Sequence, residues 1–263
     1  MKKTILFCIV FTALFIFFSL FKNLLPSSYE RLAHGLIGTF TAFVVTYFFL
    51  RHDKKRFSDI ELVLNNKTVP NFFLGLIIGI ILMGSLATGV MYFTNVEIQS
   101  NPSVSKFQFF LMTLPLIPLA FMEELGFRAY PLQMLKRNYS IILSVVITSL
   151  LFALYHIANG WSVTSSFYGP GVWGLLFGGA AVYSKGIALP TGIHYALNLT
   201  TSAFGESDSK VALWVVKQTA GSSSIYKGIG LAIVLPSIIV FLVGAFGLFW
   251  LYKNETHEIK NIK

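Results

Sequence analysis

The sequence predicts an all-α protein, a polytopic transmembrane bundle of about eight spanning helices with both termini in the cytoplasm. Of its 263 residues, 55% are hydrophobic and only 12% are charged, and the mean hydropathy is +0.70. A soluble domain carries about 25% charged residues. A chain this apolar needs lipid around it, and its length accommodates roughly seven to nine spans of about 20 residues with short loops.

Eight apolar segments, separated by more polar loops, underlie this count. They are 5–25, 32–50, 71–93, 107–135, 139–158, 168–184, 187–205 and 228–252. The fourth contains Pro115 and Pro118, which predict a kink or a broken start, because proline lacks the N–H that a helix interior uses. The first follows Lys2 and Lys3, as a signal peptide would. It is too long for one and precedes no clear A-x-A cleavage pattern, so we expect a retained anchor.

The basic residues predict the orientation in the membrane. With a cytoplasmic N-terminus and eight spans, 13 of the 20 Lys and Arg residues fall on the cytoplasmic side and 6 on the other, with Arg128 inside the membrane. Cytoplasmic loops of membrane proteins carry such an excess. The net charge of +9 therefore needs no nucleic-acid partner. We expect a multi-pass protein of the cell membrane, with the bacterial cytoplasmic membrane favoured, and membrane lipids as its surroundings.

Small residues give two further expectations. The one cysteine, Cys8, excludes an intrachain disulfide and a cysteine-based metal cluster. Glycines spaced four apart, Gly75/Gly79 and Gly174/Gly178, allow helices to approach closely. We expect these pairs to pack helices inside one bundle, with dimerisation as the alternative.

Six polar or charged side chains lie inside three of the apolar segments. They are Glu123, Glu124 and Arg128 in the fourth, His156 in the fifth, and His194 and Asn198 in the seventh. A charged group at the centre of a bilayer costs about 2.5–3.5 kcal/mol on insertion scales. We therefore expect these side chains to turn away from lipid and to gather around one hydrated cavity.

Their spacing sharpens this expectation. Glu124 and Arg128 are four residues apart with the acid first, the favoured order for an ion pair within a helix. Glu123 has no basic residue at the corresponding position and must find its partners on other helices. His194 and Asn198 lie on one helix face. A structural interpretation stays open for each group, because a buried ion pair can fix helix packing and a lone buried histidine is often a core residue.

Together these residue types can hydrolyse a peptide bond. A carboxylate in a cavity with little water is a strong enough base to take a proton from water near neutral pH. One imidazole can hold the water or carry a proton, and a second imidazole with an amide can donate hydrogen bonds to a developing oxyanion. Since no G-x-S-x-G element offers a covalent nucleophile, the residues favour direct attack by water.

Three short motifs in this region resemble those of the CPBP family, the CAAX prenyl proteases and bacteriocin-processing enzymes, also called the Abi family. M-E-E-L-G-F-R at 122–128 resembles its E-E-x-x-x-R motif. F-A-L-Y-H at 152–156 resembles its F-x-x-x-H motif, and H-Y-A-L-N at 194–198 its H-x-x-x-N motif. The resemblance covers about 105–205, the expected catalytic core of a single transmembrane domain over 1–263.

The resemblance implies an eight-helix intramembrane endopeptidase that cleaves membrane-associated peptides or proteins. It implies that Glu123 is the base that activates water and that His156 assists it. It further implies that His194 and Asn198 form the oxyanion pocket.

The same resemblance gives supporting roles to Glu124 and Arg128 and leaves the question of a metal open. Members are often labelled metalloproteases, and two glutamates with two histidines could bind Zn²⁺. The sequence has no H-E-x-x-H motif, and we expect no metal cofactor. In the metal-dependent alternative, Glu123, His156 and His194 are the ligands and the second glutamate is the base.

Two other functions compete with the protease. A non-catalytic bacteriocin-immunity or scaffold protein would keep the same fold, and an immunity phenotype that survives Glu123→Ala would favour it. Buried acids and histidines also build proton relays in transporters, but no inverted repeat relates the two halves of this chain.

Overall fold

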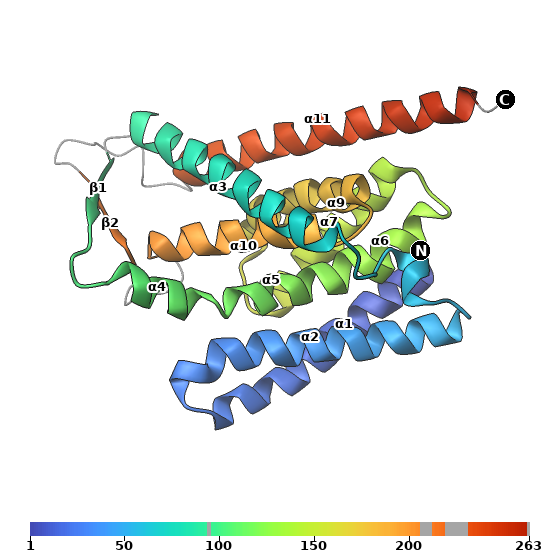
Figure 1. Ribbon diagram of the computed structural model, residues 1–263, viewed down its shortest axis with the longest axis horizontal. Helices are drawn as coiled ribbons and strands as arrows, with labels where there is room; N and C mark the ends of the chain where they lie inside the picture. Colours follow the sequence, from blue (N-terminus) through green and yellow to red (C-terminus); the bar gives the residue numbers. More distant parts are fainter. Residues whose placement is uncertain (94–95, 206–211, 219–230, 262–263) are drawn as a thin grey trace.

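Helices form nearly all of the computed structural model, which describes residues 1–93, 96–205, 212–218 and 231–261 (Figure 1). The α-helices in this part of the chain are α1 (Lys2–Ser19), α2 (Ser27–His52), α3 (Thr68–Phe93), α4 (Lys106–Thr113), α5 (Leu116–Glu124), α6 (Tyr130–Lys136), α7 (Ile141–Ala158), α8 (Val163–Ser166), α9 (Val172–Ser184), α10 (Ala188–Ala203) and α11 (Leu231–Asn261). Two short 3₁₀ helices, η1 (Leu20–Leu24) and η2 (Phe57–Ile60), follow α1 and α2.

Six helical stretches of the described residues are long and apolar enough to cross a membrane. They are Lys2–Leu24, Tyr29–His52, Thr68–Gly89, Lys106–Lys136, Ile141–Ala158 and Pro236–Asn254. They coincide with the first five predicted segments and with the eighth, of which 228–230 lies outside the described residues. The sixth segment forms the π-helical turn η4 (Phe167–Gly171) together with α9, and the seventh forms α10; neither is among these six stretches. The helical class is confirmed, and the count of eight spans stays a prediction.

The start of α1 and the end of α11 lie at the same end of the bundle (Figure 1). The turn between α1 and α2 lies at the opposite end, as do β1 and β2. An even number of passes gives this arrangement. The side of the membrane on which the termini lie stays a prediction.

The sequence predicted no strand, and on this point it was wrong. β1 (Val96–Ser100) and β2 (Trp214–Gln218) form a two-stranded antiparallel sheet. The register runs from Val96 opposite Gln218 to Ser100 opposite Trp214. Asn101 extends the pairing, because its side-chain amide donates to the carbonyl of Ala212 at 2.9 Å. The sheet joins the connection after α3 to the connection after α10.

The predicted break in the fourth segment is present. α4 ends at Thr113 and α5 begins at Leu116, on either side of Pro115. A second irregularity was not predicted: the π-helical turn η3 (Leu125–Ala129) separates α5 from α6. Such a turn adds a residue to the helix and occurs frequently at functional sites. Here it begins directly after the two acids.

Both glycine pairs pack helices within the chain, as predicted. A Cβ atom at Gly75 or Gly79 of α3 would lie 2.1 or 2.4 Å from atoms of α10. A Cβ at Gly174 or Gly178 of α9 would lie 3.0 or 2.6 Å from atoms of α7. Cβ atoms essentially never come as close as the contacts at Gly75, Gly79 and Gly178, and the contact at Gly174 is at the limit. These glycines therefore allow α3 and α9 to pack against the two helices that carry the histidines.

An aromatic core on α1 supports the other side of the site. Phe7, Phe11 and Phe15 are fully buried on one face of α1. The ring of Phe11 packs edge-on against Phe127 of η3 at a centroid distance of 5.9 Å and stacks on Tyr155 of α7 at 6.0 Å. Aromatic pairs in these geometries stabilise a fold by about 0.5–1.5 kcal/mol beyond their burial. They fix η3 and α7 relative to one another.

Candidate active site

The two predicted acids end α5, and both are buried. The exposed fractions of Glu123 and Glu124 are 8% and 0%. Successive residues of an α-helix project about 100° apart, so the two adjacent side chains point in different directions. Glu123 faces a cavity, and Glu124 faces the packed interior.

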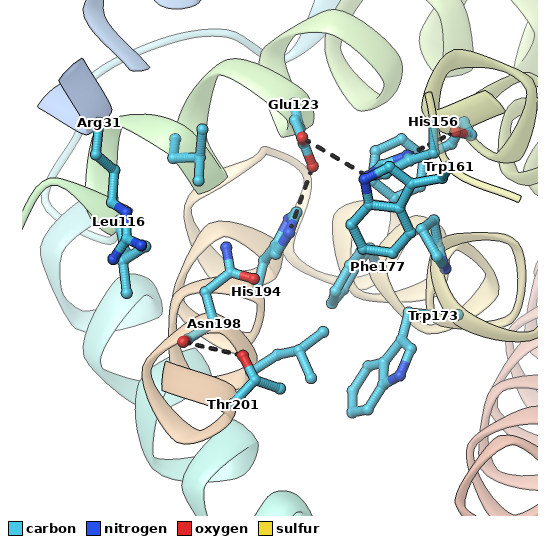
Figure 2. Close-up of a pocket in the computed structure, with 15 residues that line it drawn as sticks. Arg31, Leu116, Glu123, His156, Trp161, Trp173, Phe177, His194, Asn198 and Thr201 are labelled. Atoms are coloured by element: carbon cyan, nitrogen blue, oxygen red, sulfur yellow. Dashed lines mark hydrogen bonds and ion pairs between the residues drawn. The ribbon is translucent and has the colours of Figure 1, made fainter. Parts of the chain in front are cut away.

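Glu123 lies between two imidazoles from other helices, as its lack of a local partner predicted (Figure 2). Its Oε1 atom is 3.9 Å from Nε2 of His156 on α7. Its Oε2 atom is 3.5 Å from Nε2 of His194 on α10. The structure thus brings together the carboxylate and both imidazoles from three apolar helices.

The other nitrogen of each ring has a partner that fixes the ring. Nδ1 of His156 donates to the carbonyl oxygen of Phe152 at 3.0 Å, because a carbonyl can only accept. Nδ1 of His194 lies 2.8 Å from Oε1 of Glu124. Both rings therefore turn Nε2 toward Glu123, and the bond on Nδ1 sets the proton arrangement of each ring.

The predicted ion pair of Glu124 and Arg128 is present across the π-helical turn. Nε of Arg128 lies 3.4 Å from Oε2 of Glu124, and both side chains are fully buried. The guanidinium carbon lies 4.3 Å from the ring centroid of Phe152 and 5.4 Å from that of Phe177. Aromatic faces attract a cation that has lost its water. Glu124 therefore contacts both Arg128 and His194.

Aromatic rings enclose both histidines. Phe177 of α9 stacks on His194 with centroids 4.6 Å apart and planes at 15°. Trp161, just after α7, packs edge-on against His156 at 5.0 Å. These contacts leave each imidazole little freedom to rotate, which keeps its Nε2 atom directed at Glu123.

Asn198 lies one helical turn after His194 and lines the same cavity, as their spacing predicted (Figure 2). It is half-buried, and its side-chain amide makes no hydrogen bond with any described residue. Its N–H groups are therefore available to a bound molecule.

The cavity has a volume of about 510 Å³. Glu123, His156, His194, Asn198 and the motif residue Phe152 line it together with residues that the sequence did not single out: Arg31, Leu116, Leu119, Trp161, Gly169, Pro170, Trp173, Phe177, Leu197 and Thr201. These come from the first turns of α2 and α5, the connection after α7, the π-helical turn Phe167–Gly171, the first half of α9 and the second half of α10. In this antiparallel bundle, all of those parts lie toward the end away from the termini.

The cavity contains side chains of the kinds that bind metal ions. A carboxylate with two imidazole nitrogens is chemically suited to Zn²⁺. Among the described residues, however, no group of three or more His, Cys, Asp or Glu side chains is arranged to hold a metal ion. The absence of a metal cofactor stays a prediction.

A bundle of membrane-length apolar helices around a buried acid–imidazole cavity defines a class, the multi-pass membrane proteins with an internal polar site. Residues 105–200 match the family model described as Rce1-like: type II CAAX prenyl endopeptidase Rce1-like. The matched segment contains all three motifs, and the match confirms the resemblance to the CPBP family. It supports, at the level of the family, a membrane-associated protease that acts on peptides. No curated protein matches the chain.

Proposed function

We propose that this protein is an intramembrane endopeptidase that hydrolyses peptide bonds of membrane-associated substrates with water activated by Glu123 and His156. The observation that carries the proposal is the position of the Glu123 carboxylate, 3.9 Å from His156 and 3.5 Å from His194, inside an otherwise apolar bundle. An isolated acid has no structural reason to lie there, because burial of an unpaired charge is costly.

Water fits between Glu123 and His156. With Nδ1 protonated, a neutral His156 turns a lone pair toward the carboxylate, so two acceptors face each other across 3.9 Å. That gap is too long for a direct hydrogen bond, and one water molecule spans it with two bonds of about 2.8 Å. Glu123 takes the proton as the water oxygen attacks the scissile carbonyl carbon.

His194 and Asn198 supply the donors for the oxyanion. With a proton on both ring nitrogens, His194 donates through Nδ1 to Glu124 and offers Nε2–H to the cavity. The charges of Glu123, Glu124, Arg128 and His194 then sum to zero, which lowers the cost of their burial. As the carbonyl becomes tetrahedral, its oxygen accepts from Nε2–H of His194 and from the Asn198 amide. Collapse returns the proton from Glu123 to the leaving amine.

The test is a peptide-cleavage screen with the full chain in liposomes. We expect the wild type to cleave a subset of membrane-associated peptides in the presence and the absence of a chelator, and Glu123→Gln to cleave none. Glu61→Gln, which alters an acid outside the cavity that is ion-paired with Lys136, is the matched control. Cleavage that chelator abolishes and Zn²⁺ restores would overturn the metal-free mechanism. Absence of cleavage of any peptide by the wild type would overturn the protease.

A further inference from the structure

Arg31 is a cation in the wall of the candidate active-site cavity, and it lies outside the residues matched to the protease family. It belongs to the first turns of α2. Figure 2 shows its side chain beside Leu116, on the side of the cavity away from His156 and Trp161. A substrate whose scissile bond lies at Glu123 would pass close to it.

Close packing between α2 and α5 sets this position. A Cβ atom at Gly35 would lie 2.9 Å from the backbone nitrogen of Leu119, and one at Gly38 would lie 1.9 Å from a side chain of α5. Residues four apart on a helix share a face, so Arg31 continues the face that carries Gly35. α5 begins at Leu116, and Arg31 therefore extends this contact to the mouth of the cavity.

Among the described residues, no acid pairs with Arg31. Its neighbour Glu30 pairs with Lys22 at 3.0 Å, and the Arg31 side chain has no hydrogen bond or ion pair with any described residue. Glu123, the one acid that lines the cavity among these residues, is held at the other end between the two imidazoles. A half-buried guanidinium among leucines loses water when a substrate enters, and an anion on that substrate would offset the cost.

We propose that Arg31 binds a carboxylate of the peptide substrate, an inference that rests on the proposed function. Arg31 would then select peptides that carry a carboxylate at a fixed distance from the scissile bond. A planar guanidinium binds a carboxylate with two parallel hydrogen bonds, which gives direction as well as charge. The carboxylate belongs either to the C-terminal residue or to an Asp or Glu side chain.

Binding tests this assignment without cleavage. Fluorescein-labelled apolar pentapeptides are titrated against the Glu123→Gln protein in liposomes. One set ends in a free carboxylate, a second in an amide, and a third in an amide with one internal Asp. We expect a carboxylate peptide to bind about 10- to 100-fold more tightly than the plain amide, as is typical of a charged hydrogen-bonded pair. Tighter binding of the first set would identify the C-terminal carboxylate as the ligand, and tighter binding of the third set would identify an acidic side chain.

The preference must depend on Arg31. In the Glu123→Gln protein, Arg31→Gln or Arg31→Met should remove the carboxylate preference, and Arg31→Lys should keep part of it. Lys106→Gln, which alters an exposed cation outside the cavity, should leave the preference unchanged. Equal binding of all three peptide sets, or a preference that survives both neutral substitutions, would overturn the assignment. A carboxylate preference in a wild-type chain that cleaves none of these peptides would support the Arg31 site and count against the protease.

Discussion

Nδ1 of His194 lies 2.8 Å from Oε1 of Glu124, while Nε2 of the same ring lies 3.5 Å from Oε2 of Glu123. Two acids that are adjacent in sequence therefore hold one imidazole from opposite sides. Only Glu123 reaches the cavity, so we assign Glu124 the role of orienting His194. The ion pair with Arg128 on the other oxygen keeps Glu124 in place.

Glu124→Gln should lower kcat about 10- to 100-fold, the usual effect of losing a group that orients a functional imidazole. KM should change little, and the pH–rate profile should shift, because the proton arrangement of His194 is no longer fixed. The variant also leaves buried Arg128 without its acid, so rates are compared at a temperature where circular dichroism shows both proteins folded. An unchanged kcat and pH profile would remove Glu124 from the proposed site.

Gly75→Ala should disrupt the contact between α3 and α10. The new Cβ would lie 2.1 Å from the backbone oxygen of Leu189, and backbone cannot move aside without shifting the helix that carries His194. We expect a lower unfolding temperature and reduced cleavage. Gly84→Ala on the same helix is the matched control, because nothing lies within 4 Å of its Cβ and alanine favours helix by about 0.5–1 kcal/mol. Equal behaviour of the two variants would contradict this packing.

Stability at acid pH should depend on Asp53, at the end of the bundle that holds the termini. Burial raises the pKa of Asp53, but hydrogen bonds from Lys3, Tyr130 and His52 outweigh it and bring the pKa below the ordinary 3.8. A lowered folded-state pKa stabilises the protein above pH 3.8, and this contribution is lost as the pH falls through the folded-state value. The unfolding temperatures of the wild type and Asp53→Asn should therefore differ at neutral pH and converge below pH 3.8. A difference that does not change with pH would contradict this.

The cavity should open on the side of the membrane opposite the basic loops. Trp161 lines it just after α7, whereas Lys54 follows the end of α2, where Asp53 pairs with Lys3 at the start of α1. In oriented cells, Trp161→Cys should react with a membrane-impermeant thiol reagent, and Lys54→Cys should react only after permeabilisation. The native Cys8 is 4% exposed and contributes little background. The reverse pattern would show that the predicted orientation is wrong.

Much of the architecture and the grouping of the site follow from the sequence, for a physical reason. Lipid penalises Glu123, His156 and His194 so strongly that they gather wherever a bundle forms. The break near Pro115 likewise follows from the missing N–H of proline. Contacts that depend on few residues could not be predicted in this way.

The contact between Glu124 and His194 is one of these. The sequence already offered Arg128 as a partner for Glu124 within the same helix, so nothing in it indicated a second partner on another helix. The strands β1 and β2 are another. They pair segments that flank α4 to α10 in sequence. Val96 to Gln99 alternates apolar and polar residues, but Trp214–Gln218 does not, so the sequence indicated no partner for the first strand. Arg31 also gave no signal, since a basic residue near the start of an apolar segment is ordinary in a membrane protein.

The most direct test of the account is the rate of peptide cleavage by Glu123→Gln relative to the wild type, with both proteins in liposomes and both folded. Glutamine keeps the size and polarity of the side chain but cannot take a proton from water. We predict a loss of at least about 100-fold, the lower end of the contribution of a general base. A variant that cleaves the same peptide at the wild-type rate would contradict the account.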